Sequence, residues 1–263
     1  MKFDYNLYND TPQSTIDLFE KIINTKYDLE ELLTRISVME TKTNICIWQH
    51  RDEKHEPSKT ALWLLESRSS YISVAYCYNN YVNAFLIDAF YDHFEKFDED
   101  NKISLGLRAC QVIIELQNTL ISIKSSLDRI IGIFCEYYRG ISKDTTLGHK
   151  TIKEDGSASY TGFLSFCNQM KEKDEVFSYI LSEYEDWIAD CVKPRDSVVH
   201  YGDFFNQYDF FEDVQIEIPI STNKHRNETI EINIITLKKY VKKYYNFMDV
   251  LIKHLWRIEL LSL

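Results

Sequence analysis

Glycine and proline are scarce along this chain, and their scarcity limits the folds that it can adopt. Only 7 Gly and 4 Pro occur among 263 residues. A sheet-rich protein of this length needs many tight turns, and such turns rely on these two residue types. Because 44% of the residues are hydrophobic, the chain can also bury a substantial core, which excludes disordered and fibrous classes. The sequence therefore predicts a globular protein built mainly from long helices.

A first helix is predicted from near Thr11 to about Ile36, and apolar residues recur at helical spacing over four further long stretches. These four predicted helices run from about Lys59 to Phe97, from Ile103 to Tyr138, from Asp174 to Lys193 and from Leu237 to Leu260. Within the first of them, Ser67 to Ser70 predicts a break. Residues 140–162 are polar and rich in turn formers, so they predict a loop with short local order.

The period changes to strict alternation near the C-terminal end. Val214 to Ile220 and Thr229 to Ile234 alternate apolar and polar residues, and a polar stretch lies between them, which predicts a β-hairpin. The predicted fold class is all-α, a helical bundle with a β-hairpin insertion around 214–234. The acidic run Asp98 to Asn101 predicts a boundary between an N-terminal helical region, 1–100, and a helical domain, 103–263. The alternative is that both parts pack as one continuous domain.

Charge and cysteine usage narrow the class of protein. A net charge of −11 argues against a general nucleic-acid coat, although it leaves room for a local basic cleft or a basic partner. The six cysteines include no Cys-x-x-Cys spacing, which favours reduced, buried thiols over disulfides or zinc ligands. The first residues lack the apolar core of a signal peptide. The charge-free run from Tyr71 to Ile87 contains three Asn and predicts a buried helix. We expect a cytoplasmic protein that does not bind a membrane.

The segment from Lys193 to Gly202 combines an arginine, an aspartate and a histidine behind a proline. Pro194 favours the start of a new helix. On that helix Asp196 and His200 are four residues apart and therefore neighbours, so the carboxylate can orient the imidazole and favour its protonated form. Arg195, in the first turn, can bind two phosphate oxygens through its guanidinium.

These groups are sufficient to cleave RNA without a metal or a cofactor. His200 can take the proton of a ribose 2′-hydroxyl or give a proton to the leaving 5′-oxygen, and Arg195 can stabilise the charge that develops on the phosphorus. The predicted products are a 2′,3′-cyclic phosphate and a 5′-hydroxyl. DNA lacks the attacking hydroxyl and is not expected to be cleaved. Lys193 and Tyr201 are predicted to bind the substrate beside these catalytic residues.

This segment resembles the signature of the HEPN superfamily, the higher-eukaryote and prokaryote nucleotide-binding helical domain. The signature is an Arg, then Asn, Asp or His, then a His four to six residues after the Arg, and Arg195, Asp196 and His200 match it. The Leu127-Asp128-Arg129 segment of a long helix and the Trp187 helix are similar as well. The resemblance covers roughly Ile103 to Leu263 and leaves residues 1–100 unexplained.

Many members of this superfamily are metal-independent ribonucleases that act as dimers in toxin–antitoxin and antiviral systems. The resemblance therefore implies an endoribonuclease that acts on RNA, forms a homodimer with a composite active site, and has an antitoxin or another defence-system protein as its partner. One branch carries a Tyr two residues after the motif His, which the antitoxin modifies. Here Gly202 holds that place and Tyr201 comes one residue early, so that form of regulation is not implied.

Two other interpretations remain open. The acidic charge favours a non-catalytic HEPN module that binds a nucleotide, RNA or a protein, and an unrelated helical scaffold could carry the motif by coincidence. His50 and His55 match no metal-ligand spacing. The aromatic residues of 71–91 predict a core or a dimer interface. Four lysines beside three tyrosines on the last helix predict a solvated face first, and an RNA guide with stacked bases second: Lys238, Lys239, Lys242, Lys243, Tyr240, Tyr244 and Tyr245.

Overall fold

The computed structural model describes residues 59–94, 102–142, 145–193, 215–222 and 225–261, together with Asp17, Thr34 and Ser37, which are helical. Over these residues the protein is mostly helical, with two small antiparallel sheets, as expected for an all-α fold with a hairpin. The elements are α3 (Lys59–Phe94), α4 (Lys102–Tyr137), β1 (Lys150–Ile152), β2 (Ala158–Tyr160), α5 (Gly162–Met170), α6 (Glu175–Glu183), the π-helical turn η3 (Tyr184–Ile188), β3 (Gln215–Thr222), β4 (His225–Asn233) and α8 (Ile234–Leu261). The domain boundary predicted at residues 98–101 lies outside the described ranges.

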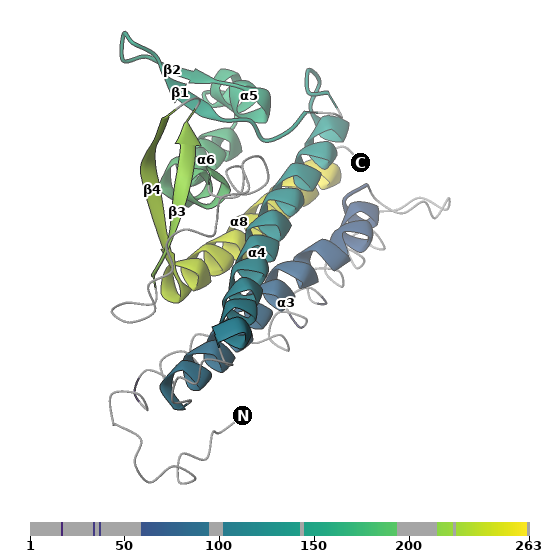
Figure 1. The fold of residues 1–263 in the computed structure, drawn as a ribbon. Helices are drawn as coiled ribbons and strands as arrows, with labels where there is room; N and C mark the ends of the chain where they lie inside the picture. The colour runs from purple at the N-terminus through teal and green to yellow at the C-terminus, as the bar shows by residue number, and fades with distance from the viewer. Residues whose placement is uncertain are drawn as a thin grey trace.

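Three long helices, α3, α4 and α8, form the body of the molecule (Figure 1). Their bounds confirm the helices predicted from apolar spacing to within a few residues. The predicted break at Ser67 to Ser70 is wrong, because α3 is continuous there. Ser67 is buried, and Ser73 donates a hydrogen bond from its hydroxyl to the carbonyl of Ser69, one turn earlier. Serine is accepted inside the helix because its hydroxyl finds such an acceptor.

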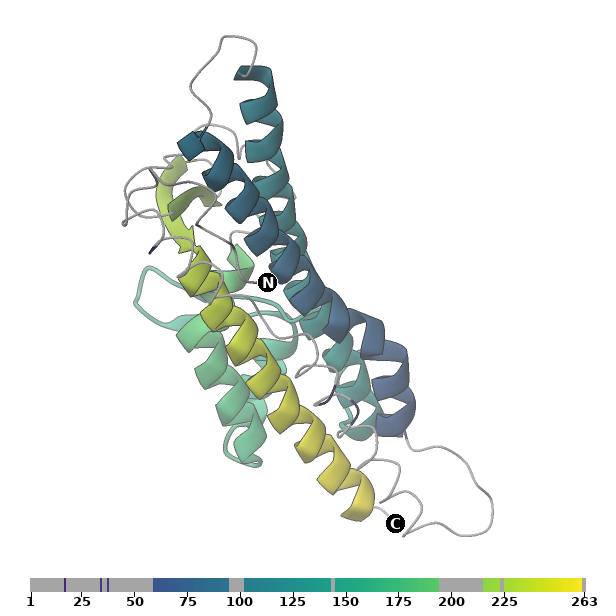
Figure 2. The same ribbon diagram turned by 90° about the horizontal axis from the view of Figure 1, so that it is seen from below.

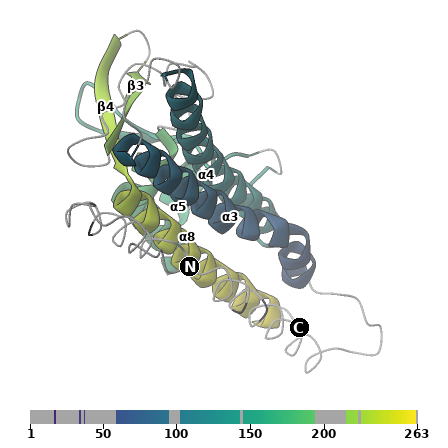
Figure 3. The ribbon, with the colours of Figure 1, turned by 60° about the horizontal axis from the view of Figure 1, so that its bottom comes forward.

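The core is one continuous cluster that runs from α3 to α8. The aromatic residues of α3 are part of it, as predicted: Tyr71, Tyr78, Tyr81 and Phe85 are buried, whereas Tyr76 is 57% exposed. Views from two further directions show α8 lying alongside α3 (Figures 2 and 3). Among the described residues, no helix is long and apolar enough to cross a membrane.

The second half of the chain adds two hairpins to this bundle. Strands β3 and β4 pair antiparallel with Ile216 opposite Ile232 and Ile218 opposite Ile230, which confirms the predicted hairpin. The strands also extend into the polar stretch expected to be loop, as far as the pair Thr222 and His225. Strand β4 leads directly into α8. The shorter β1–β2 hairpin and the start of α5 occupy the segment predicted as a loop with short local order.

A close backbone crossing holds the start of α5. Thr161 provides no side-chain cap, and instead the N–H groups of Phe163 and Leu164 donate to the carbonyls of Thr146 and Leu147. The chains can approach this closely because Gly148 adopts a positive φ of 84° and a Cβ there would lie 2.0 Å from the Thr161 carbonyl oxygen. Only glycine fits such a position without strain.

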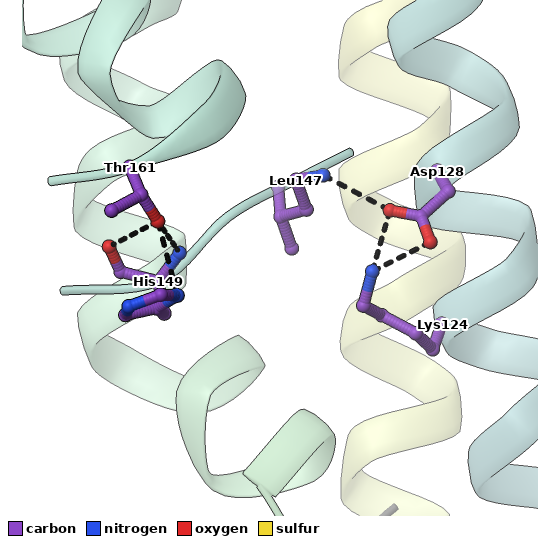
Figure 4. A network of polar contacts seen from close by, with 5 residues as sticks. All are labelled: Lys124, Asp128, Leu147, His149 and Thr161. Carbon is purple, nitrogen blue, oxygen red and sulfur yellow. Dashed lines mark hydrogen bonds and ion pairs between the residues drawn. The ribbon is translucent and has the colours of Figure 1, made fainter. Parts of the chain in front are cut away.

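The same loop is tied to α4 and to the end of β2 by side chains (Figure 4). The Asp128 carboxylate accepts a hydrogen bond from the Leu147 N–H at 3.0 Å and binds the Lys124 ammonium at 2.5 Å. On the other side of the crossing, the Thr161 hydroxyl accepts from the N–H of His149 at 3.0 Å. The loop therefore joins the bundle to the layer that contains α5 and α6.

Candidate functional site

The residues predicted to be catalytic follow directly after a described helix. Arg195, Asp196, His200 and Tyr201 lie outside the described residues. Lys193, the predicted substrate-binding residue nearest to them, is the last described residue of the helix that continues from α6 and η3, and it is exposed. The structure therefore describes the helix that leads into the motif and the residues around that helix. The positions of the other motif residues relative to one another are not described.

Helix α6 begins at a regular cap and is anchored by its apolar face. The Asp174 carboxylate accepts a hydrogen bond from the Val176 N–H, which satisfies one of the free donors at the helix start. Val176, Phe177, Ile180 and Leu181 are buried. The spacing of these residues is that of a helix with one face against the core.

The helix then widens into the π-helical turn η3. The N–H of Ala189 donates to the carbonyl of Tyr184, five residues earlier instead of four. This extra residue rotates the side chains that follow relative to those of α6. Trp187 is fully buried, and its indole N–H donates to the Glu183 carboxylate at 2.6 Å. Single π turns are found often at functional sites, and the sequence pattern of this helix did not predict one.

Two acidic side chains of η3 tie this helix to elements on either side. Glu185 binds the Lys150 ammonium of β1 and accepts a hydrogen bond from the Tyr160 hydroxyl of β2 at 3.3 Å. Asp186 forms an ion pair with Lys243 of α8. The bonds from Lys150 and from Lys243 lower the pKa of Glu185 and of Asp186, respectively. The helix that enters the motif is therefore held to the β1–β2 hairpin and to α8 at the same turn.

This helix runs antiparallel to α8. Tyr179 stacks on Phe247 with ring centroids 5.8 Å apart, and further along Trp187 lies 6.5 Å from Tyr240. Burial, followed by the charge of Asp190, raises the pKa of Tyr240. Because the contacts move toward the start of α8 as the helix proceeds, its last described turn lies toward the first turns of α8.

Four lysines lie on those first turns. Lys239 and Lys242 are exposed, while Lys238 and Lys243 are half-buried. The accompanying tyrosines are not available for base stacking: Tyr240, Tyr244 and Tyr245 are all buried. The Tyr244 hydroxyl bonds to Ser126, and the Tyr245 hydroxyl donates to the carbonyl of Tyr71. Stacking of RNA bases on these rings, which was the second interpretation of this stretch, is therefore wrong, whereas the lysine surface remains.

A second polar cluster joins the far ends of three helices, and sequence reasoning missed it. The Tyr138 hydroxyl donates to the Asp174 carboxylate at 2.9 Å and lies 2.7 Å from Nε2 of His254. Burial and the hydrogen bond to Asp174 raise the pKa of Tyr138, and burial lowers the pKa of His254. The rings of Phe134, Tyr138 and His254 stack nearly parallel. This cluster connects α4, α6 and α8, and its members are 36 and 116 residues from Tyr138 in sequence.

Metal ligation receives no support from the described ranges. No group of three His, Cys, Asp or Glu residues that could hold a metal occurs among them. His50 and His55 lie outside these ranges. Cys77, Cys135, Cys167 and Cys191 are free thiols. Burial raises the pKa of Cys167 and Cys191, so these two thiols stay protonated and unreactive at neutral pH. Comparisons with protein-family models, curated proteins and solved structures found no match to this chain.

Proposed function

We propose that this chain is a metal-independent endoribonuclease of the HEPN type that works in the cytoplasm as part of a toxin–antitoxin or antiphage system. The observation that carries the proposal is the sequence Arg195-Asp196-x-x-x-His200, which begins two residues after the last described residue of an anchored helix. Two residues of chain reach at most about 7 Å, so covalent geometry alone keeps the backbone of Arg195 within that distance of Lys193.

The chemistry follows from the three side chains. The ribose 2′-oxygen attacks the adjacent phosphorus, the bond from phosphorus to the 5′-oxygen breaks, and one proton leaves the 2′-hydroxyl while another reaches the 5′-oxygen. His200 is the proton acceptor or donor, Asp196 orients its ring, and Arg195 stabilises the negative charge on the phosphoryl oxygens. A homodimer with two motifs at one cleft would supply one histidine for each proton transfer.

The described part of the chain supports this proposal in two ways. The body is a helical bundle, the fold class that the motif requires. The helix before the motif is fixed at its last turns by buried Trp187 and by the pair Asp186–Lys243. A catalytic group needs such support, because small displacements of a reacting side chain cost large factors in rate.

The second candidate function is a non-catalytic module of the same family that binds a nucleotide, RNA or a protein. It is favoured by the net charge of −11, which weakens RNA binding over most of the surface. An intact Arg, Asp and His set is not needed for binding alone. Cleavage therefore separates the two functions.

The test is to incubate purified wild-type protein with end-labelled RNA in excess EDTA and to analyse the products. We expect fragments that end in a 2′,3′-cyclic phosphate, and a loss of about 100- to 10,000-fold in rate for His200→Ala, the range for removal of a general acid or base. His149→Ala is the matched control, because His149 is an exposed imidazole in another loop and its removal is expected to leave the rate unchanged. Equal cleavage by wild type and His200→Ala would overturn the mechanism. Absence of cleavage by either protein would favour the binding module.

A further inference from the structure

The outer face of α8 differs in charge from the rest of the protein. This helix holds six Lys or Arg and only two Asp or Glu, so it contributes +4 to a chain whose net charge is −11. Four of its six cations lie within its first ten residues: Lys238, Lys239, Lys242 and Lys243. A concentrated positive surface on an acidic protein attracts a polyanion at that place alone.

Helix geometry gathers these four side chains on one face. Lys238 and Lys242, and likewise Lys239 and Lys243, are four residues apart and therefore neighbours on the helix surface. The opposite face is buried through Leu237, Val241 and Tyr244. Lys239 and Lys242 are thus exposed on a helix whose other side is fixed in the core.

In the described part of the chain, acidic side chains of η3 and of the turn that follows it lie beside this surface. Asp186 forms an ion pair with Lys243 and is also close enough to Lys239 for that charge to lower its pKa. Asp190 lies beside Tyr240. Burial and then the like charge of Lys242 lower the pKa of Lys238. Crowded ammonium groups of this kind gain free energy when an anion binds between them.

We infer that Lys238, Lys239 and Lys242 bind the phosphate backbone of the single-stranded RNA substrate and guide it to the motif that begins at Arg195. This inference rests on the proposed ribonuclease function and names how the substrate is held. Lys193, the last described residue of the helix that packs antiparallel to α8, is exposed as well. Lys243 is assigned to the pair with Asp186, which holds the helix in place, and not to the RNA.

The buried tyrosines define what this surface cannot recognise. With the rings of Tyr240, Tyr244 and Tyr245 covered, no described aromatic side chain of these turns can stack on a base. Binding is then carried by phosphate charge, which single-stranded DNA shares with RNA. Binding at this surface is therefore independent of base sequence, and a DNA strand binds and competes although it is not cleaved.

The test measures binding in a protein that cannot cleave. A fluorescein-labelled 20-mer of uridine is titrated at 50 to 200 mM NaCl with two full-length proteins. One carries His200→Ala alone, and the other carries His200→Ala together with K238Q/K239Q/K242Q. Three lost phosphate contacts are expected to lower the slope of log K against log salt by about 2, since each contributes about 0.7 on a single strand, and to weaken binding at least about tenfold at low salt. The thymidine 20-mer is expected to bind His200→Ala within about threefold of the RNA.

A control with the same change in net charge is K153Q/K171Q/K173Q, because these three lysines are exposed and lie in the β1–β2 hairpin and in the turn before α6. It is expected to bind as His200→Ala does, and both triple variants should keep the helical circular dichroism and the urea midpoint. Unchanged affinity and slope in K238Q/K239Q/K242Q, or an equal loss in the control, would overturn the inference. The inference would also be overturned if a glutamate 20-mer bound through the same lysines and RNA did not, since the surface would then serve an acidic protein partner.

Failure of the two proposals can be told apart by measuring cleavage with His200 intact. The expected result for K238Q/K239Q/K242Q is a raised KM with kcat unchanged, because the lysines bind substrate away from the reacting phosphate. If wild type cleaves and the triple variant has an unchanged KM, the proposed RNA-binding surface is wrong and the proposed ribonuclease activity is retained. If wild type does not cleave while His200→Ala binds RNA through these lysines, the proposed ribonuclease activity is wrong and the proposed RNA-binding surface is retained.

Discussion

The helical bundle and the layer beside it are held together by different forces. The bundle comprises α3, α4 and α8, and its contacts are mainly buried aliphatic and tyrosine side chains such as Leu116, Leu120 and Tyr244, each 0% exposed. The second region, which we call the α5–α6 layer, comprises residues 145–193. This layer has buried residues of its own, and it is also held by hydrogen bonds and ion pairs: Asp128 to Leu147, Asp174 to Tyr138, Glu185 to Lys150 and Asp186 to Lys243.

The bundle therefore supplies mainly stability, whereas the polar contacts of the α5–α6 layer determine mainly its orientation. Apolar burial is non-directional, and it tolerates small shifts at a modest cost in free energy. Hydrogen bonds and ion pairs at the ends of the layer fix its orientation more than they add stability, since exposed pairs contribute about 0 to 1 kcal/mol each. The layer leads into the motif through Lys193, so its orientation is the property that function requires.

The largest effect is expected inside the layer, at the crossing of Gly148 over Thr161, which follows directly on the link from Leu147 to Asp128 of the bundle. Gly148→Ala introduces a Cβ 2.0 Å from a backbone oxygen at a positive φ, and we expect a loss of about 3 kcal/mol in the free energy of unfolding from overlap and backbone strain. The measurement is urea denaturation followed by circular dichroism. Gly156→Ala is the matched control: its φ is also positive, but nothing lies within 4 Å of the new Cβ, so only about 1 kcal/mol is expected. Equal losses would show that the crossing is not a tight contact.

A smaller effect is expected from pH, at the place where His254 of α8 meets Asp174 of the layer. Burial, followed by the charge of Arg257, lowers the pKa of His254, while Asp174 and Glu175 act in the opposite direction. The unfolded chain therefore binds a proton more readily than the folded one, so stability is lost as pH falls below the unfolded histidine pKa of about 6.5. The bundle's buried tyrosines, such as Tyr81, have raised pKa values and stay neutral throughout this range.

The measurement is the urea midpoint of wild type and of His254→Gln at pH 7.5 and at pH 5.5. We expect wild type to lose more stability between the two pH values than the variant, which has no group to protonate at that place. An equal loss in both proteins would assign the pH dependence to other groups. His149→Gln serves as a second control, since that imidazole is exposed.

The same division explains how much of the fold the sequence could predict. The bundle helices were predicted because their apolar period is local, and α4 was expected over Ile103–Tyr138 and lies at Lys102–Tyr137. The β3–β4 hairpin was predicted because alternation is local too. Helix α5 was missed, since its first N–H groups are satisfied by the carbonyls of Thr146 and Leu147 and not by a side-chain cap that could be recognised in the sequence.

The candidate site divides in a similar way. Arg195, Asp196 and His200 could be selected because their spacing alone suggests a mechanism, and they remain predictions. The ties that orient the preceding helix could not be selected. Glu185 and Asp186 are adjacent in sequence, yet they bind Lys150 and Lys243, which lie on different elements. The three-dimensional packing, including the extra residue of the π turn, determines which lysine each of these two carboxylates binds.

The smallest effect is expected inside the bundle, where polar groups contribute little. The Tyr81 hydroxyl is buried and has no hydrogen-bond partner among the described residues, whereas the Tyr78 hydroxyl donates to the carbonyl of Ile234 at 3.3 Å. Tyr81→Phe removes an unsatisfied group, so we expect stability unchanged or raised by up to about 1 kcal/mol, while Tyr78→Phe is expected to lose about 1 kcal/mol. Urea denaturation of the two variants beside wild type, at pH 7.5, measures both. A loss of 1 kcal/mol or more in Tyr81→Phe would contradict the contrast, because the bundle would then also depend on a polar tie at its centre.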